Sequence, residues 1–225
     1  MAVQIYQYET NRRLSESLAE CVASGLEGAL NLRDHATLAV SGGSTPKPLF
    51  ELLSHCDIDW GRVRVTQVDE RWVPEDHERS NTRLLRERLL VDRAAEATYI
   101  PLYKPAETPE EVLDELGEAI RPEMPISILL LGMGADMHTA SLFPGADKLA
   151  EALDRHAPPL MAMRAPGAPE PRITLTAPVL KSAMTTHVVI TGAEKRAALE
   201  AARRKKPIEA PIAAVLGDAI VHWAE

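Results

Sequence analysis

Short apolar runs of strand length alternate along the chain with stretches in which apolar residues recur at helical spacing. The runs predict strands over Val3–Tyr8, Thr37–Val40, Val63–Val68, Ile126–Leu131, His187–Ile190 and Ile212–Leu216. The stretches between them predict helices, among them Arg13–Leu30, Pro48–Leu53, Thr82–Val91, Pro109–Ile120 and Glu194–Arg204. The strands are nearly continuously apolar, which is typical of a parallel sheet buried on both faces. We therefore expect an α/β fold with helices on both faces of the sheet.

The bulk composition fits one globular domain spanning residues 1–225, because 225 residues with 45% hydrophobic and 26% charged side chains can bury one full core. The segment Ala157–Pro171 holds five prolines. We expect it to be a surface connection and not a domain linker, because strand and helix patterns resume after it.

The net charge of -8 removes the average attraction to a nucleic-acid backbone or an anionic membrane, so we predict neither as a partner. The basic run Arg203–Lys206 is expected to be the cationic end of a helix. Cys21 and Cys56 are too few for a disulfide framework, which fits a reducing cytoplasm. The first residues lack a basic segment followed by an apolar one, so we expect no signal peptide. No window resembles a membrane span of about 18 apolar residues.

Polar and glycine-rich segments follow four of the predicted strands. They are "SGGSTPKP" after Val40, "DERWVPEDHERSN" after Val68, "GMGADMHTASLFPG" after Leu131 and "TGAEKR" after Ile190. In open parallel sheets, ligands bind beyond the carboxyl ends of the strands, where the strand order reverses. The sequence therefore predicts one site built from these segments.

The first segment has the features of an anion site. Gly42 and Gly43 allow close approach of the backbone, Thr45 can cap a helix, and Pro46 suits a first helical turn whose free amides bind phosphate. The alternative is an ordinary strand-to-helix turn. It is neither a Walker loop nor the nucleophile elbow of hydrolases, since the residues that those motifs require are missing.

The other segments supply charged candidates, each with a simpler alternative. Asp69 and Arg71 follow a buried strand directly, whereas the later charges of that segment form a solvated loop and Ser80 or Asn81 can cap the next helix. Lys195 in a first helical turn opposes the helix dipole unless an anion binds there. Arg172 is a second candidate cation, and a surface salt bridge is the alternative for both cations.

His138 is the candidate general acid and base, because imidazole takes up and returns a proton near neutral pH. Asp136, two residues earlier, can orient the ring. A dinucleotide fingerprint is excluded here, because Met137 stands where its third glycine belongs. The seven histidines include no pair at metal-binding spacing, so we predict no metal and no cofactor.

The motifs "SGGSTP", "DERWVP" with "SN", "GMGADMHTASLFPG", "RITLTAPVL" and "VVITGAEKRAAL", in this order, resemble the 6-phosphogluconolactonase family over about Ala39 to Leu216. The resemblance implies a modified doubly wound, Rossmann-like, mainly parallel sheet, as in glucosamine-6-phosphate deaminase and ribose-5-phosphate isomerase. It implies a hydrolase that opens 6-phospho-D-glucono-1,5-lactone in the second step of the oxidative pentose phosphate pathway. It leaves the oligomeric state open.

The resemblance also implies residue roles. His138 would activate water, Asp136 would assist it, and Asp69 matches a position that the deaminases use for proton transfer. The phosphate or sugar hydroxyls would be held by Gly42, Gly43, Ser44, Thr45, Arg71, Arg172 and Lys195. Family members usually have glycine at position 137, so a positive φ there would strain Met137.

Two rival functions stay open at this stage. One is a sugar-phosphate isomerase or deaminase on the same fold, although the deaminases carry an additional acid after the histidine that "HTASLFPG" lacks. The other is a sugar-phosphate sensor without turnover, which would not need Asp136 and His138.

Overall fold

The computed structural model describes residues 3–43 and 45–225. Its strands are β1 (Gln4–Tyr8), β2 (Ala36–Val40), β3 (Val63–Gln67), β4 (Asp69–Arg71), β5 (Thr98–Tyr99), β6 (Ile128–Gly132), β7 (Leu160–Met163), β8 (Arg172–Leu175), β9 (Thr185–Thr191) and β10 (Ile220–Ala224). Its α-helices are α1 (Asn11–Leu30), α2 (Lys47–Ser54), α3 (Asn81–Arg88), α4 (Leu113–Ile120), α5 (Leu149–Leu153), α6 (Ala177–Lys181) and α7 (Ala193–Ala202).

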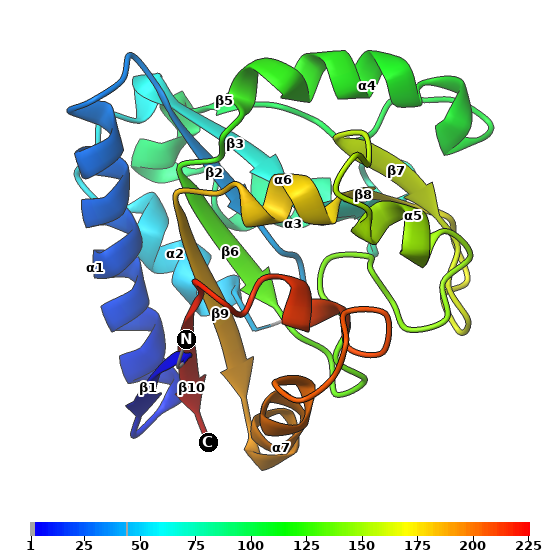
Figure 1. Cartoon of the computed structure of the whole chain (residues 1–225). Coiled ribbons are helices and arrows are strands. Elements are labelled where there is room, and N and C mark those ends of the chain that lie inside the picture. The colour runs from blue at the N-terminus through cyan, green and yellow to red at the C-terminus, as the bar shows by residue number, and fades with distance from the viewer. Residues whose placement is uncertain (1–2, 44) are drawn as a thin grey trace.

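The main sheet has the strand order β1-β10-β9-β6-β2-β3-β5, and every pair in it is parallel (Figure 1). After β2, the chain first adds β3 and β5 on one side of β2. It then adds β6, β9 and β10 on the other side. The strand order therefore reverses between β2 and β6. A ligand site is expected at the carboxyl ends of these two strands.

Each face of the sheet is covered by helices, as the continuous apolar runs predict. Leu38 and Val40 of β2 pack in a core with α1, α2 and α3, whereas Ala39 between them packs in a second core with α4, α6 and α7. This follows from the alternation of side chains along a strand. The predicted α/β class with a mainly parallel sheet is confirmed.

A second, three-stranded sheet of order β4-β8-β7 is antiparallel and lies beside the second core. The apolar runs of the sequence predict none of its three strands. The segment Ala157–Pro171, expected as a surface connection, contains β7, whose four residues are all buried. Its flanking prolines concealed a strand of only four residues, and the prediction of a purely surface segment is wrong.

The strand predicted over Ile212–Leu216 is also wrong. Pro211–Ala214 forms a short 3-10 helix, and Ile212 and Leu216 are buried in the second core. The strand that completes the sheet is β10, which lies between β1 and β9. The predicted helix Pro109–Ile120 begins as a 3-10 turn and continues as α4.

The basic run at residues 203–206 lies just beyond the end of α7 and is exposed. None of the helices within residues 3–43 and 45–225 combines the length and apolar character that crossing a membrane requires.

Candidate active site

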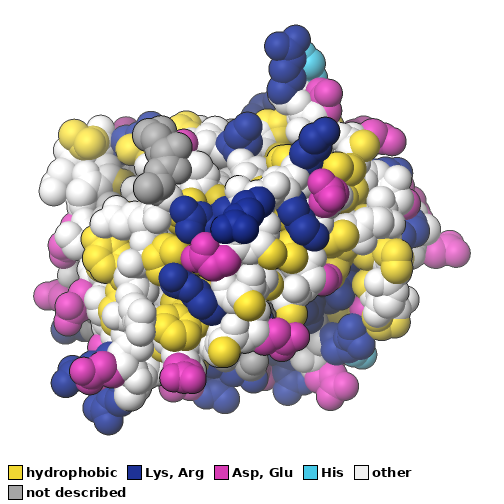
Figure 2. Space-filling view, turned by 60° about the horizontal axis from the view of Figure 1, so that its bottom comes forward, with side chains coloured by type: hydrophobic (Ala, Val, Ile, Leu, Met, Phe, Trp, Pro, Cys, Tyr) yellow, Lys and Arg dark blue, Asp and Glu magenta, His cyan; other side chains and the backbone are white. Residues whose placement is uncertain are grey.

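The four polar segments meet at the edge of the sheet where β2, β6 and β9 end, around a cavity of about 400 Å³. Figure 2 looks toward this end of the molecule, and Lys and Arg side chains gather across its middle. Eight of the predicted site residues line the cavity: Gly42, Gly43, Thr45, Asp69, Arg71, His138, Arg172 and Lys195. Ser44 lies outside the described residues.

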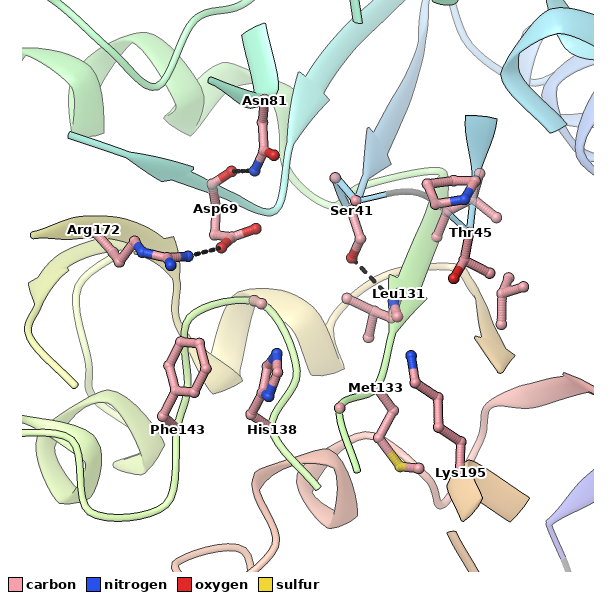
Figure 3. A pocket seen from close by; sticks show the side chains of 18 of the residues that line it. Ser41, Thr45, Asp69, Asn81, Leu131, Met133, His138, Phe143, Arg172 and Lys195 are labelled. Carbon is pink, nitrogen blue, oxygen red and sulfur yellow. Dashed lines mark hydrogen bonds and ion pairs between the residues drawn. The ribbon is translucent and has the colours of Figure 1, made fainter. Parts of the chain in front are cut away.

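The glycine segment forms the wall that follows β2. A Cβ at Gly42 would lie 1.9 Å from Asn81 Oδ1, and Gly43 has φ +98, so both positions favour glycine. Ser41 Oγ accepts a hydrogen bond from the amide of Gly132 at 3.1 Å, which ties the ends of β2 and β6 together (Figure 3). Helix α2 starts at Lys47 with Pro46 as its cap and no side-chain capping bond, so the capping role expected for Thr45 is wrong.

Strand β4 directs alternate side chains to opposite sides. Asp69 and Arg71 line the cavity. Asp69 is buried and accepts a hydrogen bond from Ser141 Oγ at 2.6 Å, and its Oδ2 lies 3.7 Å from Nη1 of Arg172. Asn81 donates from Nδ2 to the Asp69 carbonyl at 2.8 Å. Asp69 therefore sits in a buried network that joins β4, β8 and the His138 loop.

Glu70 points away from the cavity and is fully buried. Its carboxylate accepts hydrogen bonds from donors in β3, β4 and the start of α3, including the amides of Asn81 at 2.8 Å and Thr82 at 2.7 Å. Burial raises the pKa of Glu70, while these bonds oppose the rise. Ser80 caps α3 through the amide of Arg83, as the sequence predicts. Glu70 thus fixes the start of α3 beside the cavity.

The loop after β6 presents the imidazole. His138 Nδ1 and Asp136 Oδ1 are 2.5 Å apart, and Asp136 also accepts the His138 amide at 3.2 Å. A Cβ at Gly134 would lie 2.3 Å from the same imidazole, so glycine is needed there. Phe143 stacks on His138 with ring centroids 4.1 Å apart. Asp136 is half exposed and is not part of the cavity wall, so it contacts the ring from outside.

Met137 adopts φ +69, the conformation that the family glycine favours. Its carbonyl accepts a hydrogen bond from the amide of Ile212 at 3.1 Å, and its side chain packs against the second core. These contacts hold a strained residue between the acid and the base.

Lys195 is the third residue of α7, which follows Gly192 with φ +84. Its side chain points into the cavity (Figure 3) and forms no ion pair with any residue that the structure describes. The alternative interpretation of Lys195, a surface salt bridge, is therefore wrong. Arg172 has an ion pair, but a buried one inside the site.

Four further residues contribute that the sequence analysis did not assign to the site: Ser41, Asn81, Ser141 and Phe143. The sequence predicts Asn81 only as a possible helix cap, and no spacing pattern points to the other three. Among the described residues, no group of three or more His, Cys, Asp or Glu side chains is arranged to hold a metal ion.

Residues 9–223 match the family model described as glucosamine-6-phosphate isomerases/6-phosphogluconolactonase. The chain belongs to this family. A 6-phosphogluconolactonase from Rhizobium meliloti is 42% identical over the full length of both chains, and one from Pseudomonas putida is 37% identical over 99% of this chain and 93% of the relative.

Solved structures of family members agree with the fold. A 6-phosphogluconolactonase from Shewanella baltica superposes with a TM-score of 0.96 at 36% identity, covering 100% of this chain and 98% of the other. A monomeric glucosamine-6-phosphate deaminase has a TM-score of 0.82 at 15% identity over 99% and 97% of the two chains, which shows a shared fold only.

Proposed function

We propose that this chain is a carboxylic-ester hydrolase that converts 6-phospho-D-glucono-1,5-lactone to 6-phospho-D-gluconate, the second step of the oxidative pentose phosphate pathway. The observation that carries the proposal is the His138–Asp136 pair at a cavity that also holds Lys195, Arg71 and Arg172. The names of the full-length relatives support the same activity. We further propose that the protein works in the cytoplasm without a metal or cofactor, as the sequence predicts.

In the proposed mechanism, Asp136 holds the proton on Nδ1 of His138, so that Nε2 faces the cavity as the base. His138 takes a proton from water as the water oxygen adds to the lactone carbonyl carbon, C1. When the bond from C1 to the ring oxygen breaks, the imidazolium returns the proton to that oxygen. Water, and no side chain, is the nucleophile.

We assign the phosphate to the wall of the cavity that Lys195 and the glycine segment form. Lys195 and the backbone at Gly42 and Gly43 come from two different strand ends and face the same space. Charge-assisted bonds from an ammonium group and free amides suit a phosphate dianion. Thr45 adds a hydroxyl to this wall.

The decisive experiment replaces His138 with alanine and follows lactone hydrolysis above the spontaneous rate. General base catalysis contributes about 10²–10⁴-fold, so His138→Ala should lower kcat by about that factor while the protein stays folded. His156→Ala, at an exposed histidine that does not line the cavity, is the matched control and should keep full activity. Activity of His138→Ala within a few-fold of wild type would reject this mechanism.

The rival functions are separated by a panel of three substrates: the phosphorylated lactone, glucosamine 6-phosphate and ribose 5-phosphate. A deaminase or isomerase would turn over one of the last two, and a sensor would bind phosphorylated sugars without turnover. The presence of the His138–Asp136 pair in the cavity favours catalysis.

A further inference from the structure

Arg172 is a buried arginine with unused donors. Its exposed fraction is 6%, yet none of its N–H groups has a hydrogen-bond acceptor among residues 3–43 and 45–225. Its ion-pair partner is Asp69 Oδ2 at 3.7 Å, and that oxygen already accepts from Ser141. Burial lowers the pKa of Arg172. Because buried donors are normally bonded, the guanidinium is expected to meet an acceptor supplied by a ligand.

A second arginine strengthens this expectation. Arg71 and Arg172 are direct partners in the antiparallel pairing of β4 with β8, so their side chains leave the same face of the small sheet. Both line the cavity. Like charges in directly opposed positions repel each other. An anionic group bound between Arg172 and the centre of the cavity would offset that repulsion.

The position of Arg172 indicates which part of the substrate it meets. Its guanidinium lies 5.7 Å from the centre of the Phe143 ring, and the same ring stacks on His138 with centroids 4.1 Å apart. Arg172 and His138 are thus connected through one aromatic ring, and Lys195 enters the cavity from a different element (Figure 3). Arg172 therefore lies at the end of the cavity that holds the base.

We propose that Arg172 is a catalytic residue that binds the oxygen on C1 of the lactone, and that it does not bind the phosphate. This inference rests on the proposed function. As water adds to C1, the C1–O double bond becomes an oxyanion, to which Arg172 donates. When the ring C–O bond breaks, C1 becomes a carboxylic acid, which releases its remaining proton to water. Arg172 continues to hold the resulting carboxylate. Asp69 lies 3.7 Å from Nη1, and no described residue accepts a hydrogen bond from the guanidinium, so its donors stay available to a ligand.

The proposal makes the product carboxylate a recognised group, which can be tested by binding without turnover. 6-Phosphogluconate and glucitol 6-phosphate share the phosphate and the carbon chain, but only the first has a carboxylate. Dissociation constants of both ligands are measured by calorimetry for wild type, Arg172→Met, Arg172→Lys and Lys195→Ala. Thermal unfolding of each variant verifies that it is folded.

Wild type should bind 6-phosphogluconate at least about tenfold more tightly than glucitol 6-phosphate, because a guanidinium–carboxylate contact is charge-assisted. Arg172→Met should bring this ratio to within about threefold, and Arg172→Lys should restore part of it. Lys195→Ala should weaken both ligands by a similar factor and keep the ratio.

Two results would overturn the proposal: equal affinities of wild type for the two ligands, or equal weakening of both ligands in Arg172→Met. Equal wild-type affinities would overturn the proposal even if the Arg172 variants do not fold. Kinetics add a second measurement, in which Arg172→Met lowers kcat on the phosphorylated lactone about 10²-fold. Failure of the proposed function would instead appear as an unaffected His138→Ala variant, which these binding measurements do not involve.

Discussion

The Asp136 carboxylate acts on His138 from the solvent side, which limits what it contributes. Asp136→Asn keeps the size of the side chain but loses its charge, and the imidazolium is then less stabilised. Because the carboxylate is 54% exposed and screened by water, we expect kcat to fall by only about 10–100-fold. Steady-state kinetics check this, with exposed Asp218→Asn as the control. Unchanged kcat would show that Asp136 does not orient the ring.

Met137 gives a prediction about backbone strain. At φ +69, alanine keeps the strain and loses the packing of the methionine, whereas glycine removes the strain. Met137→Gly should therefore be more stable than Met137→Ala by about 1 kcal/mol, or about 2–4 °C in Tm for a chain of this size. At positions in helices and strands, where φ is negative, an alanine variant is more stable than a glycine variant. Calorimetric melting of both variants tests this prediction. A higher Tm for Met137→Ala than for Met137→Gly would show that the backbone at position 137 is not strained.

At the scale of elements, Glu70 connects β4 to the start of α3. Glu70→Gln replaces one acceptor oxygen with an NH₂ group that faces buried donors, so we expect a loss of about 2–3 kcal/mol in the free energy of unfolding. Asn81 at the start of α3 and Arg71, whose amide donates to Glu70, would both shift, so KM should rise as well. Urea unfolding and steady-state kinetics measure the two effects. Exposed Glu209→Gln is the control, and a variant as stable as wild type would show that Glu70 does not hold α3.

The elements also show how far the sequence predicts this protein. Central strands such as β2 and β6 are buried on both faces, so their apolar runs identified them and the polar residues that follow them. The strand β7 and the 3-10 turn at Pro211–Ala214 are short, and only tertiary packing distinguishes them. Tertiary packing also determines the roles of Ser141 and Phe143, which contact β4 and the imidazole. The sequence therefore gives no signal for these roles.

A buried pair of histidines makes the stability of the whole molecule depend on pH. His187 Nδ1 and His222 Nε2 are 3.0 Å apart, and Tyr8 contacts His222 at 2.9 Å. Burial lowers the pKa of His187 to about 4 and, with the neighbouring His187, that of His222 to about 3. Unfolded histidines bind protons near pH 6.5, so unfolding takes up protons below that value. The free energy of unfolding should therefore fall as pH drops from 6.5 toward 4.

We expect the pair to remove about 2–4 kcal/mol of stability at pH 5 relative to pH 7.5. Urea unfolding at both pH values tests this in wild type and in His222→Gln, which should show a smaller fall. Exposed His156→Ala should retain the wild-type fall. An equal fall in His222→Gln would assign the pH dependence to other groups.

The pairing of β1 with β10 also has a kinetic consequence. Tyr8 and His222 are 214 residues apart, whereas the inner pair β2 and β3 closes a far shorter loop. The entropy of closing a loop grows with its length, and pairing between distant parallel strands is slow. The β1 edge should therefore join after the folding transition state. Tyr8→Phe should speed unfolding and leave the folding rate nearly unchanged, which stopped-flow measurements in urea would show as a change in only one arm of the rate plot.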